Sequence, residues 1–155
     1  MAAAIRNRRK APTIYERTDR QYNRGFLADA IERLPTGGRL GLVVLDFDFK
    51  RLNDAHGHRV GNRALPIVSA VLKRNAHAAD IAARRGGEEL LVAFPGIFAQ
   101  AFLATCNGLV QQIRAHPGDL ANSALRLTVS FGGIHIERFE RHAFGRAFSV
   151  ADALP

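Results

Sequence analysis

Residues 84–90, with the sequence Arg-Arg-Gly-Gly-Glu-Glu-Leu, constrain this chain more than any other stretch. They separate two largely apolar runs, at residues 80–83 and 90–94. Glycine adopts the positive φ angles that tight turns between strands require, so the pattern predicts a β-hairpin with its turn at the glycine pair. Glu88 and Glu89 then come directly after the turn, on the strand that leaves it.

A second pair of carboxylates follows another apolar run earlier in the chain. Asp46 and Asp48 come at the end of the run at residues 40–45. Carboxylates at the ends of two strands can share one divalent cation, since hard cations prefer oxygen ligands. Taken alone, each motif also has a simpler interpretation: solvated acids at a strand end, and an ordinary hairpin turn.

Hydrophobic periodicity predicts one α/β domain. With 155 residues, of which 47% are hydrophobic, the chain is long enough to bury a single compact core. Apolar residues recur at helical spacing in some segments, and short continuous apolar runs predict strands between them. The predicted elements are a helix at 18–34, a strand at 40–47, a helix at 61–77, strands at 80–85 and 88–94, a helix at 97–115 and a strand at 125–136.

The cysteine content and the length of the apolar runs indicate the cellular compartment in which the chain is expected to fold. Cys106 is the single cysteine, which excludes an internal disulfide framework and favours a reducing environment. It lies in an Ala-, Phe- and Leu-rich stretch, where a small buried side chain is a better interpretation than a nucleophile. The apolar runs are too short to cross a bilayer, and no signal-peptide core follows the N-terminus. We therefore expect a cytoplasmic domain with no membrane segment in this chain.

Basic residues outnumber acidic ones and give a net charge of +8, but most of them are scattered arginines. Residues 1–15 contain a small basic cluster and are predicted to form a flexible arm. Such an arm could contact nucleic acid or an anionic membrane surface. Basic and aromatic residues are not interleaved as they are in base-stacking surfaces, so nucleic acid is not expected as a partner.

Several motifs occur together in a fixed order. The acidic motif reads Asp-Phe-Asp-Phe-Lys-Arg-Leu-Asn-Asp at 46–54 and ends with Gly-Asn at 61–62. The turn motif reads Gly-Gly-Glu-Glu-Leu at 86–90. Two flanking motifs are Leu-Thr-Val-Ser-Phe-Gly-Gly at 127–133 and Tyr-Asn-Arg-Gly-Phe-Leu at 22–27. Together these motifs resemble the GGDEF domain of diguanylate cyclases.

The resemblance implies a GGDEF domain over residues 16–155. The implied fold is α/β (α+β), palm-like and ferredoxin-like, with a central, mostly antiparallel sheet flanked by helices. The implied activity is that of a nucleotidyltransferase in signalling, which condenses two GTP molecules into cyclic di-GMP with Mg²⁺ or Mn²⁺. Because one domain holds one GTP, the reaction implies a homodimer. An upstream sensor domain or a regulatory protein is a further partner that the resemblance implies.

The resemblance also assigns roles to the acidic residues and to one lysine. Asp46 and Glu88 are the implied metal carboxylates, and the backbone carbonyl of Phe47 is a third ligand. Lys50 is implied to meet the triphosphate as a point charge. Glu89 is implied to lie near the attacking hydroxyl, where it could help to remove the proton.

Four more residues are implied to contact the substrate. Gly86 and Gly87 let the backbone approach the nucleotide, since no Cβ intervenes. Asn53 and Asn62 fall at the two positions that contact the guanine edge in the family.

The acidic motif departs from the family pattern in two ways. It is one residue shorter between Asp48 and Lys50, which shortens the loop that carries the lysine. Asn62 replaces the family's final Asp, and an amide oxygen accepts fewer hydrogen bonds from guanine than a carboxylate does. We therefore expect weaker guanine selectivity.

Two further departures lie outside the acidic motif. The family's closing segment, with its triphosphate-binding Lys and Arg, is cut short at residues 151–155, so the domain is expected to lack the usual C-terminal helix. The family's inhibitory Arg-x-x-Asp motif reads His77-Ala-Ala-Asp80, and the missing Arg argues against product inhibition there.

Two functions therefore stay open at the level of the sequence. The first is an active diguanylate cyclase, supported by the retained carboxylates and the glycine turn. The second is a catalytically degenerate domain that binds GTP or a protein partner and regulates cyclic di-GMP signalling, supported by the departures. A nucleic-acid binder that uses the basic arm has only charge in its favour.

Overall fold

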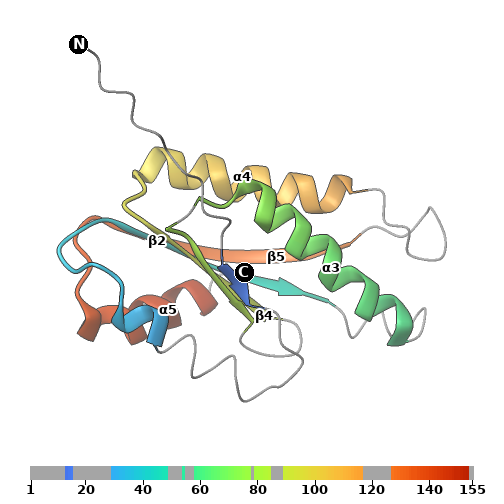
Figure 1. Ribbon diagram of the computed structural model, residues 1–155, viewed down its shortest axis with the longest axis horizontal. Helices are drawn as coiled ribbons and strands as arrows, with labels where there is room; N and C mark the ends of the chain where they lie inside the picture. Colours follow the sequence, from blue (N-terminus) through green and yellow to red (C-terminus); the bar gives the residue numbers. More distant parts are fainter. Residues whose placement is uncertain are drawn as a thin grey trace, which may run out of the picture.

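The computed structural model describes residues 13–15, 29–48, 54, 58–77, 79–84, 89–116 and 127–153, and gives the backbone alone for 13–15 and 58–65. Within these residues the chain forms one sheet with helices on both faces (Figure 1). The strands are β1 (Thr13–Tyr15), β2 (Leu40–Phe47), β3 (Ile81–Arg84), β4 (Glu89–Pro95) and β5 (Val129–Ile136). The helices are α3 (His58–Asn75), α4 (Ala99–Ala115), the 3₁₀ turn η1 (Arg141–Ala143) and α5 (Phe144–Ala153), and a short helical turn occupies residues 29–32.

The strand order in the sheet is β1-β3-β4-β2-β5. Strands β3, β4, β2 and β5 are antiparallel to their neighbours, while β1 runs parallel to β3 at the edge. This architecture confirms the predicted palm-like α+β fold with a mostly antiparallel sheet. Strand β2 is central, since it pairs with β4 on one side and with β5 on the other.

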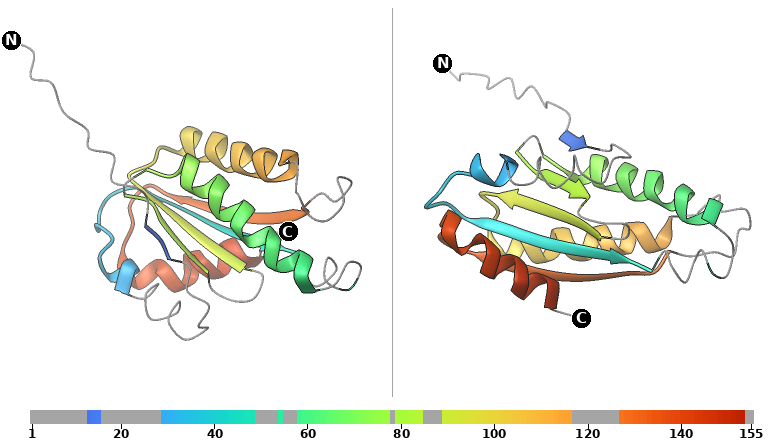
Figure 2. Two further views of the ribbon diagram at one scale, coloured as in Figure 1. Left: turned by 45° about the vertical axis from the view of Figure 1, so that its right-hand side comes forward. Right: turned by 90° about the horizontal axis from the view of Figure 1, so that it is seen from below.

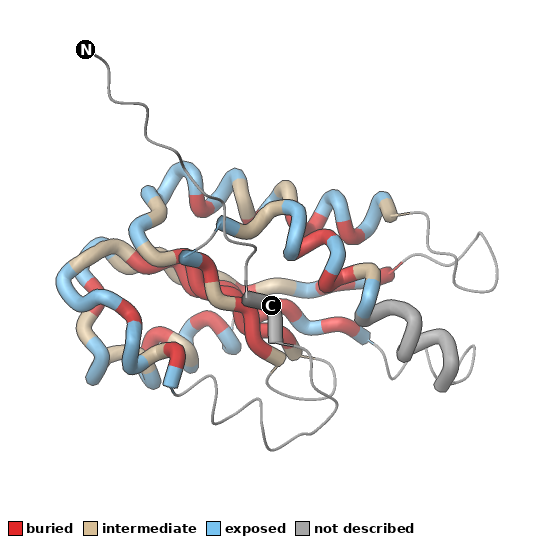
Figure 3. The backbone as a smooth tube through the Cα atoms, in the orientation of Figure 1, coloured by how far each residue is buried: buried red, intermediate tan, exposed pale blue. Residues whose placement is uncertain are grey.

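The two faces of the sheet carry separate hydrophobic cores, because successive side chains of a strand point to opposite faces. In β2, Val43, Leu45 and Phe47 pack with α3 and α4, whereas Leu42 and Val44 pack with α5. Figure 2 shows α3 and α4 on one side of the sheet and α5 on the other. Figure 3 shows the buried residues concentrated along the central strands. A continuous apolar run is what a strand covered on both faces requires.

The aromatic ring of Phe102 in α4 packs closely against glycines of two neighbouring strands. A Cβ atom added to Gly41 of β2 would clash with this ring and would lie 2.9 Å from the Ile97 side chain. At Gly133 of β5, an added Cβ would lie 3.1 Å from the ring. The two glycines therefore allow the helix to approach the sheet at this point.

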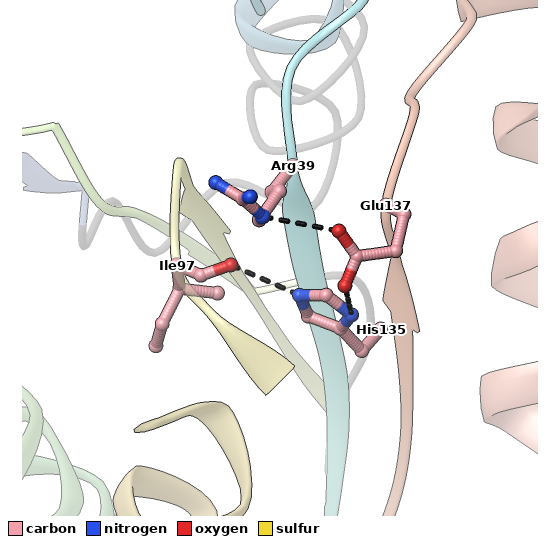
Figure 4. Close-up of polar contacts among 4 residues, drawn as sticks. All are labelled: Arg39, Ile97, His135 and Glu137. Atoms are coloured by element: carbon pink, nitrogen blue, oxygen red, sulfur yellow. Dashed lines mark hydrogen bonds and ion pairs between the residues drawn. The ribbon is translucent and has the colours of Figure 1, made fainter. Parts of the chain in front are cut away.

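A group of polar contacts joins three segments where β2 begins (Figure 4). Arg39 Nε donates to Glu137 Oε2 over 3.0 Å, and the other carboxylate oxygen lies 3.6 Å from His135 Nδ1. The His135 Nε2 atom is 2.9 Å from the Ile97 carbonyl oxygen. The Arg39 guanidinium also lies over the Phe98 ring, 4.1 Å from its centre. These contacts hold the start of β2, the end of β5 and the loop after β4 together.

Most predicted elements are present with shifted ends, and two elements were not predicted. The strand predicted at 40–47 has those bounds, while the helix predicted from residue 61 begins at His58. Strand β1 and helix α5 are absent from the predicted order, which ended at the strand near residue 136. The expectation of a domain without a closing helix needs correction, because the ten residues of α5 pack against the sheet after that strand.

Two further expectations concern membranes and the single cysteine. None of the helices that the structure describes is long and apolar enough to cross a bilayer. Cys106 is buried, as expected of a small core side chain, and its burial raises the pKa of the thiol to about 11. The helix predicted at 18–34 is described only from residue 29 onward, and the division between an arm at 1–15 and a domain at 16–155 stays a prediction.

Candidate functional site

Three polar side chains form a row across the central strands. The β2–β4 register places Asp46 directly opposite Glu89, and the β2–β5 register places Asp46 directly opposite Ser130. Residues that face each other across antiparallel strands share a face of the sheet, with Cβ atoms about 4.5–5.5 Å apart. Since Val44 and Leu91 pack with α5, strand alternation places all three polar residues on the α5 face.

The row opens into a cleft of about 450 Å³ between the strand ends and α5. The carboxyl-terminal part of α5 contributes its opposite wall, through Ala151 and Asp152. Asp46 is exposed at the end of a strand whose other side chains are buried. The lining residues are Val44, Asp46, Glu89, Ser130, Phe131, Gly132, Ala151 and Asp152.

The site begins where the apolar pattern of β2 stops. Residues 40–45 are buried on both faces, and Asp46 continues the same strand between β4 and β5, so the sheet fixes its backbone position. The side chain of Phe47 is fully buried on the opposite face, which leaves only its backbone carbonyl as a possible ligand on the acidic side. The carboxylate of Asp46 makes no hydrogen bond or ion pair with any other residue in the described part of the chain.

The structure brings together three of the predicted site residues. Asp46 and Phe47 end β2, and Glu89 begins β4 beside them. The register gives Glu89 as the direct cross-strand neighbour of Asp46, and the metal site that the resemblance assigns to Asp46 and Glu88 stays a prediction. The predicted residues that lie outside the described part are Lys50, Asn53, Gly86, Gly87 and Glu88, together with the side chain of Asn62.

The donor atoms of the cleft suit a hard cation. Carboxylate and carbonyl oxygens are the ligands that Mg²⁺ and Mn²⁺ prefer, whereas zinc sites use His and Cys. Among the residues with described side chains, no group of three or more His, Cys, Asp or Glu is close enough to hold a metal by itself. The described contribution is therefore the adjacent pair of carboxylates, Asp46 and Glu89.

Sequence reasoning missed two polar residues of the cleft. Ser130 lies in the motif at 127–133, which was recognised only as a strand, and Asp152 lies in the unpredicted α5. The sequence contained no direct sign of Ser130, because the β2–β5 register joins segments far apart along the chain. Asp152 could have been found from the helical spacing of Phe144, Phe148 and Ala151, which all pack on the sheet.

A second cleft, of about 360 Å³, lies beside the segment that matches the inhibitory motif. Its lining includes His77 and Asp80, and Asp80 is buried. The backbone N–H of His77 donates to Asp80 Oδ2 over 2.6 Å. Desolvation by burial raises the pKa of the Asp80 carboxyl, and the hydrogen bond and charge of His77 oppose this effect in part. The carboxylate is thus engaged within its own loop.

Comparisons with curated proteins give relatives that include a named diguanylate cyclase and a response regulator. Diguanylate cyclase DgcP of Pseudomonas aeruginosa is 37% identical over 137 residues, which cover 84% of this chain and 20% of that protein. The response regulator PleD of Caulobacter vibrioides is 32% identical over 122 residues, which cover 74% of this chain and 26% of PleD. The chain thus spans about a fifth to a quarter of the length of these relatives.

Solved structures with the same fold include one complex with a nucleotide and one complex with a protein. The GGDEF domain of DgcB from Caulobacter crescentus, in complex with c-di-GMP, aligns with a TM-score of 0.64 and 29% identity, covering 86% of this chain and 77% of that one. Diguanylate cyclase SiaD of Pseudomonas aeruginosa, in complex with its activator SiaC, aligns with a TM-score of 0.72 and 27% identity, covering 86% and 52%.

A family model also matches most of the chain. The model described as "Diguanylate cyclase, GGDEF domain" matches residues 18–154, which include every described strand and helix except β1. Diguanylate cyclases of this kind are generally metal-dependent, in agreement with the oxygen donors of the acidic cleft. With this match and the relatives above, the chain belongs to the GGDEF domain family of diguanylate cyclases.

Proposed function

We propose that this domain condenses two GTP molecules into cyclic di-GMP, with one GTP held by each of two copies and with Mg²⁺ or Mn²⁺ bound in the acidic cleft. The observation that carries the proposal is the pairing of Asp46 with Glu89 on one face of the sheet, at a cleft open to solvent. Joining two nucleotides requires charge neutralisation at the reacting phosphate, which carboxylate-bound cations supply.

The cation is assigned to Asp46, the backbone carbonyl of Phe47 and Glu88. When bound, it neutralises charge on the phosphates and orients them for attack. Asp46 supports this assignment because its carboxylate projects into the cleft from a rigid central strand. Lys50 is assigned to the triphosphate, where a point charge balances the phosphate oxygens.

Glu89 is assigned the role of general base, which accepts the proton of the attacking 3′-hydroxyl. As the O–H bond breaks, the oxygen bonds to the α-phosphorus and pyrophosphate leaves with the electrons of the broken P–O bond. The register supports this role, since Glu89 lies beside Asp46 and thus beside the phosphate that the cation would hold. The paired glycines, Gly86 and Gly87, are assigned to close approach of the backbone to the nucleotide.

Asn53 and Asn62 are assigned to the guanine base. The amide of Asn62 offers guanine one acceptor where the family's carboxylate offers two, so the base is held with fewer hydrogen bonds. The proposal therefore includes a smaller preference for GTP over ATP than a carboxylate would give.

The test is incubation of the purified protein with GTP and Mg²⁺, followed by chromatographic detection of cyclic di-GMP. Asp46→Asn and Glu89→Gln should each lower the rate by at least about 100-fold, since each removes several kcal/mol of transition-state stabilisation. Glu32→Gln is the matched control, because Glu32 is an exposed carboxylate in the helical turn at 29–32. Product that forms equally in all three variants would contradict the proposed site.

A second candidate is a degenerate regulatory domain that binds GTP or a protein partner without forming product. The specific observation in its favour is Asn62 in place of the family's carboxylate, together with the shortened loop before Lys50. SiaD, which has the same fold, was crystallised with a protein activator. GTP binding by calorimetry without product would favour the GTP-binding form of this candidate, and no GTP binding would favour a protein partner.

A further inference from the structure

We propose that Ser130 is a substrate-binding residue, whose hydroxyl donates a hydrogen bond to a triphosphate oxygen of GTP next to the cation site of Asp46. This inference rests on the proposed function and adds to it a residue that the sequence motifs did not single out. It follows from the position of Ser130 in the sheet and from the chemistry of the cleft around it.

The sheet holds Ser130 next to the acidic pair. Ser130 faces Asp46 directly in the β2–β5 register, so both side chains leave the same face of the sheet. The neighbours of Ser130 along β5, Val129 and Phe131, pack in the core under α3 and α4, which fixes the direction of Ser130 toward the α5 side. Ser130 is exposed and lines the acidic cleft.

The hydroxyl supplies a hydrogen-bond donor that the other described side chains of the cleft lack. Among the described lining side chains, Asp46, Glu89 and Asp152 are acceptors when ionised, and Ser130 is the one that carries a hydrogen-bond donor. A triphosphate beside three carboxylates needs donors as well as cations, because its own oxygens are acceptors. A hydroxyl can donate to such an oxygen with a short, charge-assisted hydrogen bond.

Neither the Ser130 nor the Asp46 side chain forms a hydrogen bond with another described residue. The Ser130 hydroxyl makes no hydrogen bond within the described structure, and the two side chains are not bonded to each other. Strands lie about 4.8 Å apart, and a phosphate spans this gap when one oxygen is bound to a cation at about 2.1 Å and another accepts from a hydroxyl at about 2.7 Å. A ligand that reaches both residues would satisfy both.

The experiment uses a matched pair of substitutions. Ser130→Thr keeps the hydroxyl, while Ser130→Val has nearly the same shape without it, and both side chains suit a strand. Ser149→Ala is the control, since the Ser149 hydroxyl donates to the Gly145 carbonyl within α5, over 2.9 Å, and is not among the cleft residues. Calorimetry with Mg²⁺ measures the affinity for a GTP analogue whose α–β bridging oxygen is replaced by methylene, and separately for guanosine.

We expect Ser130→Val to weaken binding of the analogue by about tenfold or more, as loss of a hydrogen bond to a charged group predicts. Ser130→Thr and Ser149→Ala should retain the wild-type affinity. Guanosine affinity should not change in any variant, because guanosine has no phosphate, whereas a general distortion of the site would weaken both ligands.

The failure of this inference can be told apart from the failure of the proposed function. Wild-type protein that binds the analogue as tightly as Ser130→Val does overturns the role of Ser130 alone. Equal loss of analogue and guanosine affinity in Ser130→Val also overturns it. Wild-type protein that binds neither ligand overturns the proposed function, and this inference with it.

Discussion

At the residue scale, the register between β2 and β4 decides which carboxylates lie side by side. Strand-end carboxylates could be predicted at Asp46 and after the glycine turn, because apolar runs end there. The resemblance assigns Asp46 and Glu88 to one cation, and this assignment stays a prediction because Glu88 lies outside the described residues. The register of β2 with β4 adds that Glu89 lies directly opposite Asp46. The position of Ser130 beside Asp46 could not be predicted, because the β2–β5 register joins segments that lie far apart in the sequence.

Asp80 gives a prediction about pH at this scale. Because burial raises the pKa of its carboxyl above the ordinary value of 3.8, the charged form destabilises the folded state at neutral pH relative to the protonated form. The contribution of the protonated carboxyl to stability is full below 3.8 and is lost as the pH rises through the raised pKa. Asp80→Asn should therefore be more stable than wild type at pH 7, with an advantage that shrinks as the pH falls.

Asparagine keeps an oxygen that can accept from the His77 N–H, so the loop contact survives the substitution. Thermal unfolding at several pH values measures the difference. Asp29→Asn, at an exposed position, is the control and is measured over the same pH values. A variant whose advantage over wild type grows toward acid pH would contradict the assigned direction.

At the element scale, the sequence predicts a strand with a continuous apolar run but does not predict the short elements β1 and α5. Strand β2 was predicted with its observed bounds because residues 40–45 form one continuous apolar run. Helix α5 was missed because it is short and its glycine, Gly145, weakens the helical pattern. Strand β1 has only three residues and is defined by its pairing with β3. Three residues are too few to show a periodic pattern in the sequence.

The contact between α4 and the sheet gives a prediction at this scale. Gly41→Ala should lower the free energy of unfolding by about 1–3 kcal/mol, because the new methyl group meets the Phe102 ring. Gly108→Ala is the matched control, since Gly108 lies inside α4 with open space around its added Cβ. That substitution should raise stability by up to about 1 kcal/mol.

Urea unfolding of the single and double variants measures the coupling between helix and strand. Phe102→Leu should cost less in the Gly41→Ala background than alone, because the smaller side chain makes room for the methyl group. Additive effects of the two substitutions would show that the ring and the glycine do not limit each other.

At the scale of the whole molecule, the proposed function gives one GTP to each copy of the domain, so the proposed reaction needs two copies face to face. The rate per mole of protein should therefore rise with protein concentration until most copies are paired. The measurement is cyclic di-GMP formation over a series of dilutions, alongside sedimentation to follow pairing. A rate per mole that is constant while the protein changes from monomer to dimer would contradict a two-copy reaction.

The central position of β2 has a mechanical consequence. Its backbone is bonded along both edges, so Asp46 cannot shift without breaking ladders to β4 and β5 together. Within the described residues, the floor of the acidic cleft is thus held from two sides. The wall opposite, formed by α5, meets the floor through packed side chains instead of a strand ladder. A shift of α5 would therefore change the shape of the cleft without breaking the strand pairing that holds Asp46.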